Sequence, residues 1–327
     1  MTRALVTRRL AGDVMDYLAE RVEVVAPPED RPIPRRELLA LAPGARGILA
    51  MLTDTIDEEV LAAAGPDLAV VANHAVGYDN VDLAACERRG VIVTNTPDVL
   101  TDATADMAWG LLLAAARRIA EGDRLMRRAA PWEWAPDFML GREVTGATLG
   151  IVGYGRIGQA VARRAQGFGM TVLYYDTRRA DAAIEAALGA RFVDLDELLA
   201  HSDFVSLHVN LTDETRHLVN ASRLASMRST AVIVNTSRGP VVDQRALFEA
   251  LRDGVIGAAA LDVTDPEPID ADDPLLGLDN CLVVPHIASA SRATRGKMAA
   301  MAAANLLAGV RGEPLPTSVN PEVRERR

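Results

Sequence analysis

Cysteine and aromatic residues are scarce in this chain of 327 residues. It has two cysteines, Cys86 and Cys281, and 4% of its residues are aromatic. Two thiols so far apart in the sequence make neither a disulfide framework nor a zinc site, and they suit a reducing compartment. We therefore expect a cytoplasmic protein without a metal site.

Long apolar runs are also missing. The apolar run within residues 1–7 is too short to form the core of a signal peptide. No window approaches the roughly 18 consecutive apolar residues of a membrane span. The net charge of −10 argues against nucleic acid or an anionic membrane as a partner. It does not exclude a small anionic substrate, because one local arginine can outweigh a diffuse acidic surface.

The length corresponds to about two domains, and the apolar runs fall into two series. In the first series valine-rich runs alternate with helical segments, which indicates an open parallel α/β sheet. Its predicted strands are 4–7, 22–25, 47–51, 69–73 and 91–95, with helices such as 36–42 and 57–63. The second series matches a doubly wound dinucleotide-binding sheet. Its six predicted strands are 148–152, 171–176, 204–209, 231–235, 258–262 and 282–284, with helices such as 158–166, 194–201 and 244–253.

Two predicted helices join the two series. Thr101 or Asp102 caps the first, which runs towards Arg128, and Ser291 caps the second. The middle of the first helix, residues 107–116, is apolar nearly all round, so we expect it to be buried between domains or subunits. The predicted domains are a discontinuous substrate-binding domain, residues 1–99 plus 289–327, and an inserted dinucleotide-binding domain, residues 100–288.

A Gly-x-Gly-x-x-Gly motif follows the first strand of the second series. Gly153 permits the tight turn, Gly155 lets backbone approach a pyrophosphate, and Gly158 lets helix and strand pack closely. The amides of Arg156 and Ile157 then open a helix whose N-terminus favours negative charge. Glycine-rich turns also arise for purely structural reasons, but here a strand precedes the motif and a helix follows it.

An acid about 20 residues after the motif supports a cofactor site. Asp176 ends the next strand, where a carboxylate accepts hydrogen bonds from the adenosine ribose and repels the extra phosphate of NADP. Arg178 and Arg179 follow directly, and either could bind that phosphate. We favour NAD, with NADP as the alternative.

Three chemically useful residues lie at or just beyond the carboxyl ends of late strands, where ligands bind in open α/β sheets. Arg238 can hold a substrate carboxylate with two parallel hydrogen bonds. His286 titrates near working pH and can supply a proton, and Glu267 can orient the imidazole and favour its protonated form. Each of the three has an ordinary structural interpretation alone, and only the combination behind a dinucleotide fold points to a keto-acid reductase.

These motifs resemble the D-isomer-specific 2-hydroxyacid dehydrogenase family, especially its glyoxylate/hydroxypyruvate reductase branch. The matching segments run along nearly the whole chain and are specific for the family, less so for the substrate. They are residues 76–82, 93–97, 101–106, 153–158, 237–243, 260–263, 267–268 and 285–288.

The resemblance implies a fold, a reaction and a set of residue roles. The fold would be two doubly wound α/β domains in a homodimer, a flavodoxin-like substrate domain and a Rossmann NAD-binding domain. The enzyme would reduce a small 2-keto acid to the (R)-2-hydroxy acid, with Arg238 on the carboxylate, His286 as acid/base and Glu267 as its partner. Backbone N–H groups of Val76 and Gly77 would also bind the carboxylate. Further cofactor contacts would come from Thr104, Thr236, Ser237 and Asp262.

Some positions depart from the family pattern or remain open. Asn210 stands where the family usually has proline at the adenine pocket, and Glu267 disfavours formate, because formate dehydrogenases of the superfamily carry glutamine there. Candidates for the wall around the substrate's side chain are Leu52, Tyr78, Trp132 and Trp134, although the tryptophans could simply pack at a dimer interface. We expect no catalytic role, and ordinary local hydrogen bonds, for His74, His201, His208 and His217.

Two competing functions are weighed against a glyoxylate or hydroxypyruvate reductase. One is a non-catalytic NAD(H)-sensing protein, which need not keep Arg238, Glu267 and His286. The other is a dehydrogenase of the same family for 2-ketogluconate, phosphoglycerate or phosphite. A phosphorylated substrate should require extra Lys or Arg in the loops of the first domain, and residues 52–55 and 73–80 contain none.

Overall fold

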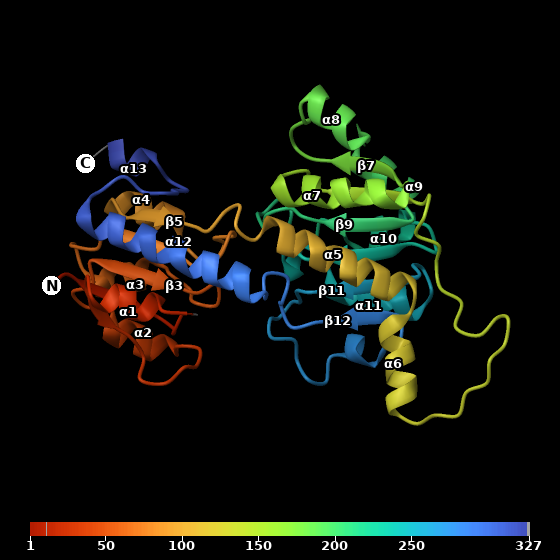
Figure 1. The fold of residues 1–327 in the computed structure, drawn as a ribbon, viewed down its shortest axis with the longest axis horizontal. Coiled ribbons are helices and arrows are strands. Elements are labelled where there is room, and N and C mark those ends of the chain that lie inside the picture. Colours follow the sequence, from red (N-terminus) through yellow and green to blue (C-terminus); the bar gives the residue numbers. More distant parts are fainter. Residues whose placement is uncertain (11, 326–327) are drawn as a thin grey trace. The chain divides into compact units, whose positions relative to one another are not determined.

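The chain divides into two compact units that are described separately. The structure is a computed structural model that describes residues 1–10 and 12–325, with side chains as far as residue 323. Unit 1 comprises residues 1–100 together with the segment from residue 290 onwards, and unit 2 comprises residues 101–289 (Figure 1). The assignment of unit 1 to substrate binding and of unit 2 to the dinucleotide remains a prediction.

Unit 1 is built on a five-stranded parallel sheet in the order β2-β1-β3-β4-β5. This is the flavodoxin-like order, with the direction of winding reversed beside β1. The strands are short, and all except the edge strand β2 are almost entirely buried, as expected for a sheet covered on both faces. Their bounds are β1 Arg3–Val6, β2 Glu23–Val25, β3 Gly47–Ala50, β4 Val70–Asn73 and β5 Ile92–Thr94.

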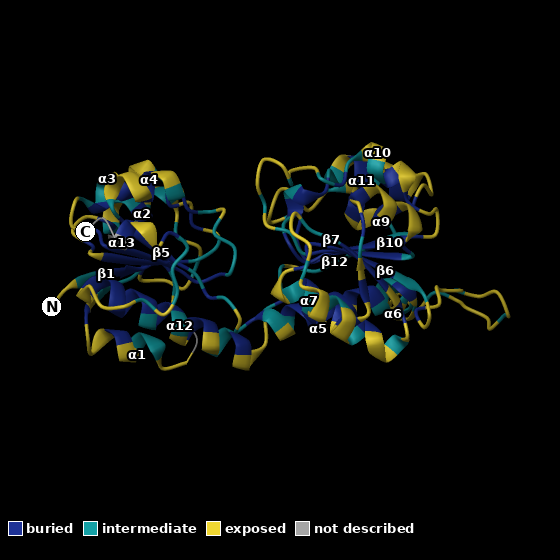
Figure 2. Cartoon of the chain, turned by 90° about the horizontal axis from the view of Figure 1, so that it is seen from above, coloured by how far each residue is buried: buried dark blue, intermediate teal, exposed yellow. Residues whose placement is uncertain are grey.

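Helices cover both faces of this sheet. In Figure 2, α1 and α12 lie on one face, and α2, α3 and α4 lie on the other. The bounds are α1 Val14–Ala19, α2 Arg35–Leu41, α3 Glu58–Ala64, α4 Leu83–Arg89, α12 Arg292–Arg311 and α13 Glu322–Glu325. Ser291 caps α12 as predicted, its side chain accepting from Thr294 N at 3.1 Å. A Cβ on Gly309 would lie 2.4 Å from Val70 Cβ, so that glycine lets α12 approach the sheet closely.

Unit 2 is built on a seven-stranded parallel sheet in the order β12-β11-β10-β9-β6-β7-β8, a doubly wound Rossmann order. The prediction of six strands was wrong by one, because β8 (Ala190–Phe192) is a three-residue edge strand with an exposed arginine in its middle. The other bounds are β6 Thr148–Val152, β7 Thr171–Tyr175, β9 Phe204–Leu207, β10 Val232–Asn235, β11 Ala258–Leu261 and β12 Cys281–Val283.

The helices of unit 2 again cover both faces. In Figure 2, α5, α6 and α7 lie on one face, and α9, α10 and α11 lie on the other. The bounds are α5 Thr101–Ala116, α6 Ile119–Arg127, α7 Arg156–Ala165, α8 Ala182–Leu188, α9 Leu195–His201, α10 Ala221–Ser226 and α11 Gln244–Arg252. Three short 3₁₀ helices lie at Gln166–Phe168, Gly239–Val241 and Pro274–Gly277. No helix of the described residues is long and apolar enough to cross a membrane.

The apolar helix after residue 100 is shorter than predicted. It breaks after Ala116, because Arg118 takes a left-handed conformation with φ of 54° and α6 starts afresh. Its apolar faces pack within unit 2: Trp109 stacks on Phe168 with ring centroids 4.7 Å apart and donates from Nε1 to Val161 O at 3.1 Å. The helix therefore has its apolar neighbours in its own unit.

Candidate functional site

The three glycines of the loop after β6 have different physical requirements. Gly153 has φ of 93°, and a Cβ there would lie 2.6 Å from the His208 backbone. A Cβ on Gly158 would lie 2.2 Å from Gly153 O, so this position needs glycine for α7 to pack on the loop. A Cβ on Gly155 would meet nothing within 4 Å. Protein packing therefore does not require Gly155, whereas close approach of a phosphate would.

Asp176 lies directly against this loop. Its Oδ2 accepts from Tyr154 N at 2.7 Å, and its Oδ1 accepts from Arg178 N and Thr177 Oγ1, both at 3.3 Å. Gly155 caps α7 without any side-chain hydrogen bond, so the helix N-terminus has no side-chain oxygen over it. The carboxylate and the helix N-terminus beside Arg156 and Ile157 form the type of cradle that holds the ribose and pyrophosphate of a dinucleotide.

Of the two arginines after Asp176, one is engaged elsewhere. Arg179 donates from Nε and Nη2 to the two carboxylate oxygens of Glu185, both at 2.9 Å. This contact, with a hydrogen bond from the Tyr174 hydroxyl, lowers the pKa of Glu185 to about 2. Arg178 is exposed, and its backbone N–H contacts Asp176.

His286 and Glu267 form a close pair in unit 2. His286 Nδ1 lies 2.5 Å from Glu267 Oε1, and the two side chains are 22% and 33% exposed. His286 has φ of 51°, a left-handed conformation that is rare and strained for a residue other than glycine. Because Nδ1 faces the glutamate, Nε2 is the ring atom left for a substrate.

Asp262 fixes the loop that carries His286. Its two carboxylate oxygens accept from Ile287 N at 2.7 Å and Ala288 N at 2.8 Å, and its own carbonyl accepts from His286 N at 2.9 Å. Burial raises the pKa of this carboxyl, while the two backbone donors oppose the rise. Asp262 therefore positions the His286 loop, whatever further contact it makes with a cofactor.

Arg238 follows β10 on a turn that Asn235 organises. Asn235 donates from Nδ2 to Arg238 O at 2.9 Å, and its Oδ1 accepts from Ser237 N at 3.0 Å and Ser237 Oγ at 2.7 Å. A Cβ on Gly239 would lie 1.9 Å from Thr264 O. This close approach brings the Arg238 turn against the segment that leads to Glu267. Sequence reasoning missed the role of Asn235, because an amide at a strand end gives no distinct signal.

Other predicted cofactor residues lie close to these elements. Thr104 is 3% exposed on α5, and Thr236 is 8% exposed with Oγ1 3.4 Å from His208 Nδ1. A cavity of about 290 Å³ adjoins the pair of His286 and Glu267. Its lining includes Asp262, Glu267 and His286 from the predicted set and adds Ile269 and Leu276, which had not been predicted.

In the loop of unit 1 that is predicted to bind the carboxylate, asparagine side chains hold two backbone carbonyl groups. Asn95 donates from Nδ2 to Val76 O at 2.9 Å, and Asn73 donates from Nδ2 to Gly77 O at 2.8 Å. Among the described residues, the N–H groups of Val76 and Gly77 have no acceptor. The two asparagines thus fix the peptide planes by their carbonyls and leave the N–H groups for a ligand. Leu52, the predicted wall residue, is half-buried after β3.

The prediction of local hydrogen bonds for the other histidines was partly wrong. His201 and His208 have local partners as expected, at Glu197 O and Ser206 Oγ, both 2.8 Å away. His74 does not, because its buried Nε2 has no partner among the described residues. Trp132 and Trp134 are 53% and 75% exposed, on the segment between α6 and β6 that extends away from unit 2 in Figure 1. Their place in the wall around the substrate's side chain remains a prediction.

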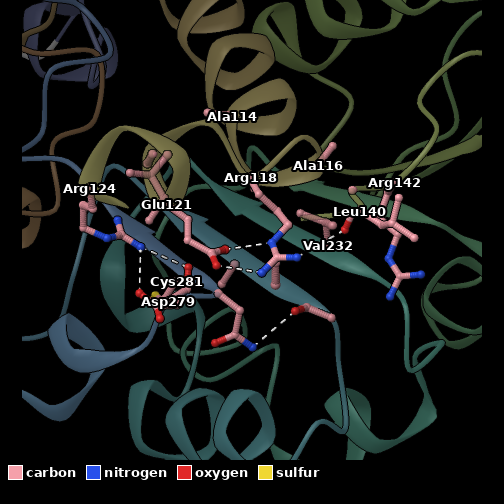
Figure 3. Close-up of a pocket in the computed structure, with 18 residues that line it drawn as sticks. Ala114, Ala116, Arg118, Glu121, Arg124, Leu140, Arg142, Val232, Asp279 and Cys281 are labelled. Carbon is pink, nitrogen blue, oxygen red and sulfur yellow. Dashed lines mark hydrogen bonds and ion pairs between the residues drawn. The ribbon is translucent and has the colours of Figure 1, made fainter. Parts of the chain in front are cut away.

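A second cavity, of about 360 Å³, lies at the opposite edge of the unit 2 sheet, beside the first residues of β10, β11 and β12 (Figure 3). Four of its five charged side chains are paired within the protein: Arg118 donates to both oxygens of Glu121, and Arg124 contacts Asp279 at 3.3 Å. Ligands of open α/β sheets bind at the carboxyl edge, and this cavity lies at the amino edge.

The chain is similar in sequence to a known family and to proteins of known name. Residues 109–288 match the family described as D-isomer specific 2-hydroxyacid dehydrogenase, NAD binding domain. The glyoxylate reductase of Korarchaeum cryptofilum is 51% identical over 324 residues, which cover 98% of this chain and 96% of that protein.

Two solved structures are similar over nearly their whole length. The TT0316 protein from Thermus thermophilus superposes with a TM-score of 0.89 and 46% identity, covering 97% of this chain and 99% of that one. The NADPH-dependent glyoxylate/hydroxypyruvate reductase of Sinorhizobium meliloti gives a TM-score of 0.84 and 33% identity, covering 97% and 96%.

Proposed function

The chain belongs to the D-isomer specific 2-hydroxyacid dehydrogenase family, and from this premise we propose that it reduces glyoxylate or hydroxypyruvate to the (R)-2-hydroxy acid. The observation that carries the proposal is the pair of His286 and Glu267, 2.5 Å apart beside a cavity of about 290 Å³. A proton donor at a carboxyl edge that also holds a dinucleotide loop is the arrangement that reduction of a carbonyl requires.

The proposed roles of the side chains follow from their contacts. His286 donates the proton from Nε2 to the oxygen that becomes the hydroxyl, since Nδ1 faces Glu267. Glu267 holds the ring in place through its contact with Nδ1. Arg238 binds the substrate carboxylate through its guanidinium, and the N–H groups of Val76 and Gly77 are further donors to it.

The residues fit a nicotinamide dinucleotide. When bound, this cofactor supplies the hydride that the protein itself lacks. Gly153, Gly155 and Gly158, with the amides of Arg156 and Ile157, would hold the pyrophosphate, and Asp176 the ribose. The remaining cofactor contacts that we propose are Thr104, Thr236, Ser237 and Asp262.

We propose NAD as the preferred form, with NADP as the alternative. The Asp176 carboxylate lies where it would repel an additional phosphate, and Glu185 already holds the Arg179 guanidinium. Arg178 is the residue that would favour NADP, and one relative is described as NADPH-dependent.

We further propose a homodimer in a reducing cytoplasm. The segment between α6 and β6 exposes several large apolar side chains that a second copy would cover. They are Trp132, Trp134, Phe138 and Leu140. Both cysteines, Cys86 and Cys281, are buried and unbridged, which suits a reducing compartment.

A substrate and cofactor panel tests the proposed function. Purified protein is mixed with NADH or NADPH, and absorbance is followed with glyoxylate, hydroxypyruvate, pyruvate and 2-ketogluconate. We expect the fastest oxidation with NADH and glyoxylate or hydroxypyruvate. Binding of NADH without turnover of any keto acid would overturn the reductase and leave a dinucleotide-sensing protein.

A further inference from the structure

A buried amide on α12 reaches the end of β5 in unit 1. Asn305 is fully buried, and the other buried residues of α12 between 298 and 310 are apolar. Its Oδ1 accepts from Thr317 N at 3.1 Å, and its Nδ2 donates to Thr317 Oγ1 at 2.9 Å and to Asn95 O at 3.4 Å. A buried amide costs free energy unless it is hydrogen-bonded, so this side chain serves the geometry of its partners and not apolar packing.

The hydroxyl of Thr317 makes a second contact with the same carbonyl. Thr317 Oγ1 donates to Asn95 O at 2.7 Å. The segment after α12 that carries Thr317 is held along β5 by an asparagine: Asn320 Oδ1 accepts from Val93 N at 2.8 Å, and Asn320 Nδ2 donates to Val91 O at 3.1 Å. These bonds fix the segment beside β5, so the Thr317 hydroxyl is held in place over the Asn95 carbonyl.

The peptide group between Asn95 and Thr96 connects these donors to the loop after β4. Its C=O, that of Asn95, accepts the two donors, and its N–H, that of Thr96, donates to Ala75 O at 2.9 Å. In a planar trans peptide the C=O and the N–H point in opposite directions. The carbonyl of Ala75 and the N–H of Val76 also belong to one peptide group. The bond to Ala75 O therefore sets the direction of the Val76 N–H.

The side chain of Asn95 holds the next peptide group of the same loop. Its Nδ2 donates to Val76 O at 2.9 Å, and this carbonyl shares a peptide group with the N–H of Gly77. Residues 95 and 96 thus orient both N–H groups that are assigned to the substrate carboxylate. Hydrogen-bonded peptide groups also polarise one another along a chain, so the donors at Asn95 O make the Val76 N–H a stronger donor.

We propose that Thr317 and Asn305 are positioning residues for substrate binding. They act through Asn95 on the N–H groups of Val76 and Gly77, and not by contact with the substrate. The inference rests on the proposed function, which assigns the substrate carboxylate to these two N–H groups. The carboxylate takes no part in the bond changes and is bound alike before and during the reaction. Loss of the positioning therefore raises KM for the keto acid and leaves kcat unchanged.

Matched hydroxyl variants test this assignment. Thr317→Val removes the hydroxyl and keeps the branched shape of the side chain, and Thr317→Ser restores the hydroxyl. Ser318→Ala is the control, because it removes a neighbouring hydroxyl that donates to Val93 O at 3.5 Å. KM and kcat for glyoxylate are measured at saturating NADH, together with the Kd of NADH and Tm. We expect Thr317→Val to raise KM about three- to tenfold, the loss of one neutral hydrogen bond, with kcat and the Kd of NADH unchanged. Thr317→Ser and Ser318→Ala should keep the wild-type KM.

The outcomes separate this inference from the proposed function. Glyoxylate turnover with the same KM in Thr317→Val and Ser318→Ala, whatever the change in Tm, would contradict the positioning role alone and leave Thr317 a structural part. Failure to turn over any keto acid would contradict the proposed function. Calorimetric titration of oxamate, a 2-keto acid analogue that is not reduced, into the NADH-loaded protein would then decide the positioning role. Weaker oxamate binding in Thr317→Val than in Ser318→Ala would support it, and equal binding or none would overturn it.

Discussion

Two glycines of the loop after β6 permit a prediction in which one substitution lowers stability and the other lowers cofactor affinity. Gly158→Ala places a Cβ 2.2 Å from Gly153 O, a backbone atom that cannot turn aside, so α7 must move away from the loop. We expect a cost of about 2–3 kcal/mol in the free energy of unfolding, typical of overpacking, which lowers Tm by roughly 4–12 °C for a unit of this size. Gly155→Ala places its Cβ where no protein atom lies within 4 Å, and its φ of −72° suits alanine.

Gly155→Ala should therefore leave Tm within a few degrees while weakening the cofactor, because its methyl group occupies the path of the pyrophosphate. We expect the Kd of NADH, measured by fluorescence titration, to rise at least about tenfold, or about 1.4 kcal/mol. Gly110→Ala, on the exposed side of α5 with equally open surroundings, is the matched control and should change neither quantity adversely. Equal loss of Tm in Gly155→Ala and Gly158→Ala, or unchanged NADH affinity in Gly155→Ala, would refute this account of the loop.

Three further predictions concern pH, cofactor choice and assembly. The pKa of His74 is lowered from 6.5 to about 4, so the unfolded chain binds its proton first as pH falls, and stability declines below pH 6.5 until the folded state also protonates near pH 4. In urea titrations His74→Asn should lose about 2 kcal/mol less stability than the wild type between pH 7 and pH 5. His208, whose burial lowers its pKa to about 3, keeps its own contribution in both proteins. The same loss in both proteins would count against this assignment. Asp176→Ser should raise kcat/KM for NADPH at least about tenfold relative to NADH, and a constant ratio would argue that this carboxylate does not meet the ribose. Trp134→Glu should shift the mass measured by light scattering from dimer towards monomer with Tm nearly unchanged, and a persistent dimer would place the interface elsewhere.

Most of the sheet elements could be predicted because buried parallel strands are short apolar runs bounded by polar residues. The run at Gly47–Ala50 and that at Val232–Asn235 are fully buried, and their positions follow from composition alone. The edge strand Ala190–Phe192 gives no such signal, since its central arginine is exposed and tertiary pairing with β7 defines it. The break at Arg118 was equally hidden, because a left-handed residue inside an otherwise helical pattern depends on how α6 packs.

Part of the candidate site could be predicted from the sequence, and part could not. Arg238, Glu267 and His286 could be singled out because each follows a strand whose carboxyl end lies at the ligand-binding edge. The residues that hold them, such as Asn235, were invisible, since an amide acts here through geometry that only the folded chain defines.

The most direct test of the central claim is the single-turnover rate of NADH oxidation with glyoxylate in the wild type and in His286→Ala at saturating cofactor. Because His286 is the proposed proton donor, we predict a fall of roughly 10²–10⁴-fold in the chemical step, with the Kd of NADH unchanged. A rate within a few-fold of the wild type would contradict the assignment of His286 and with it the proposed mechanism.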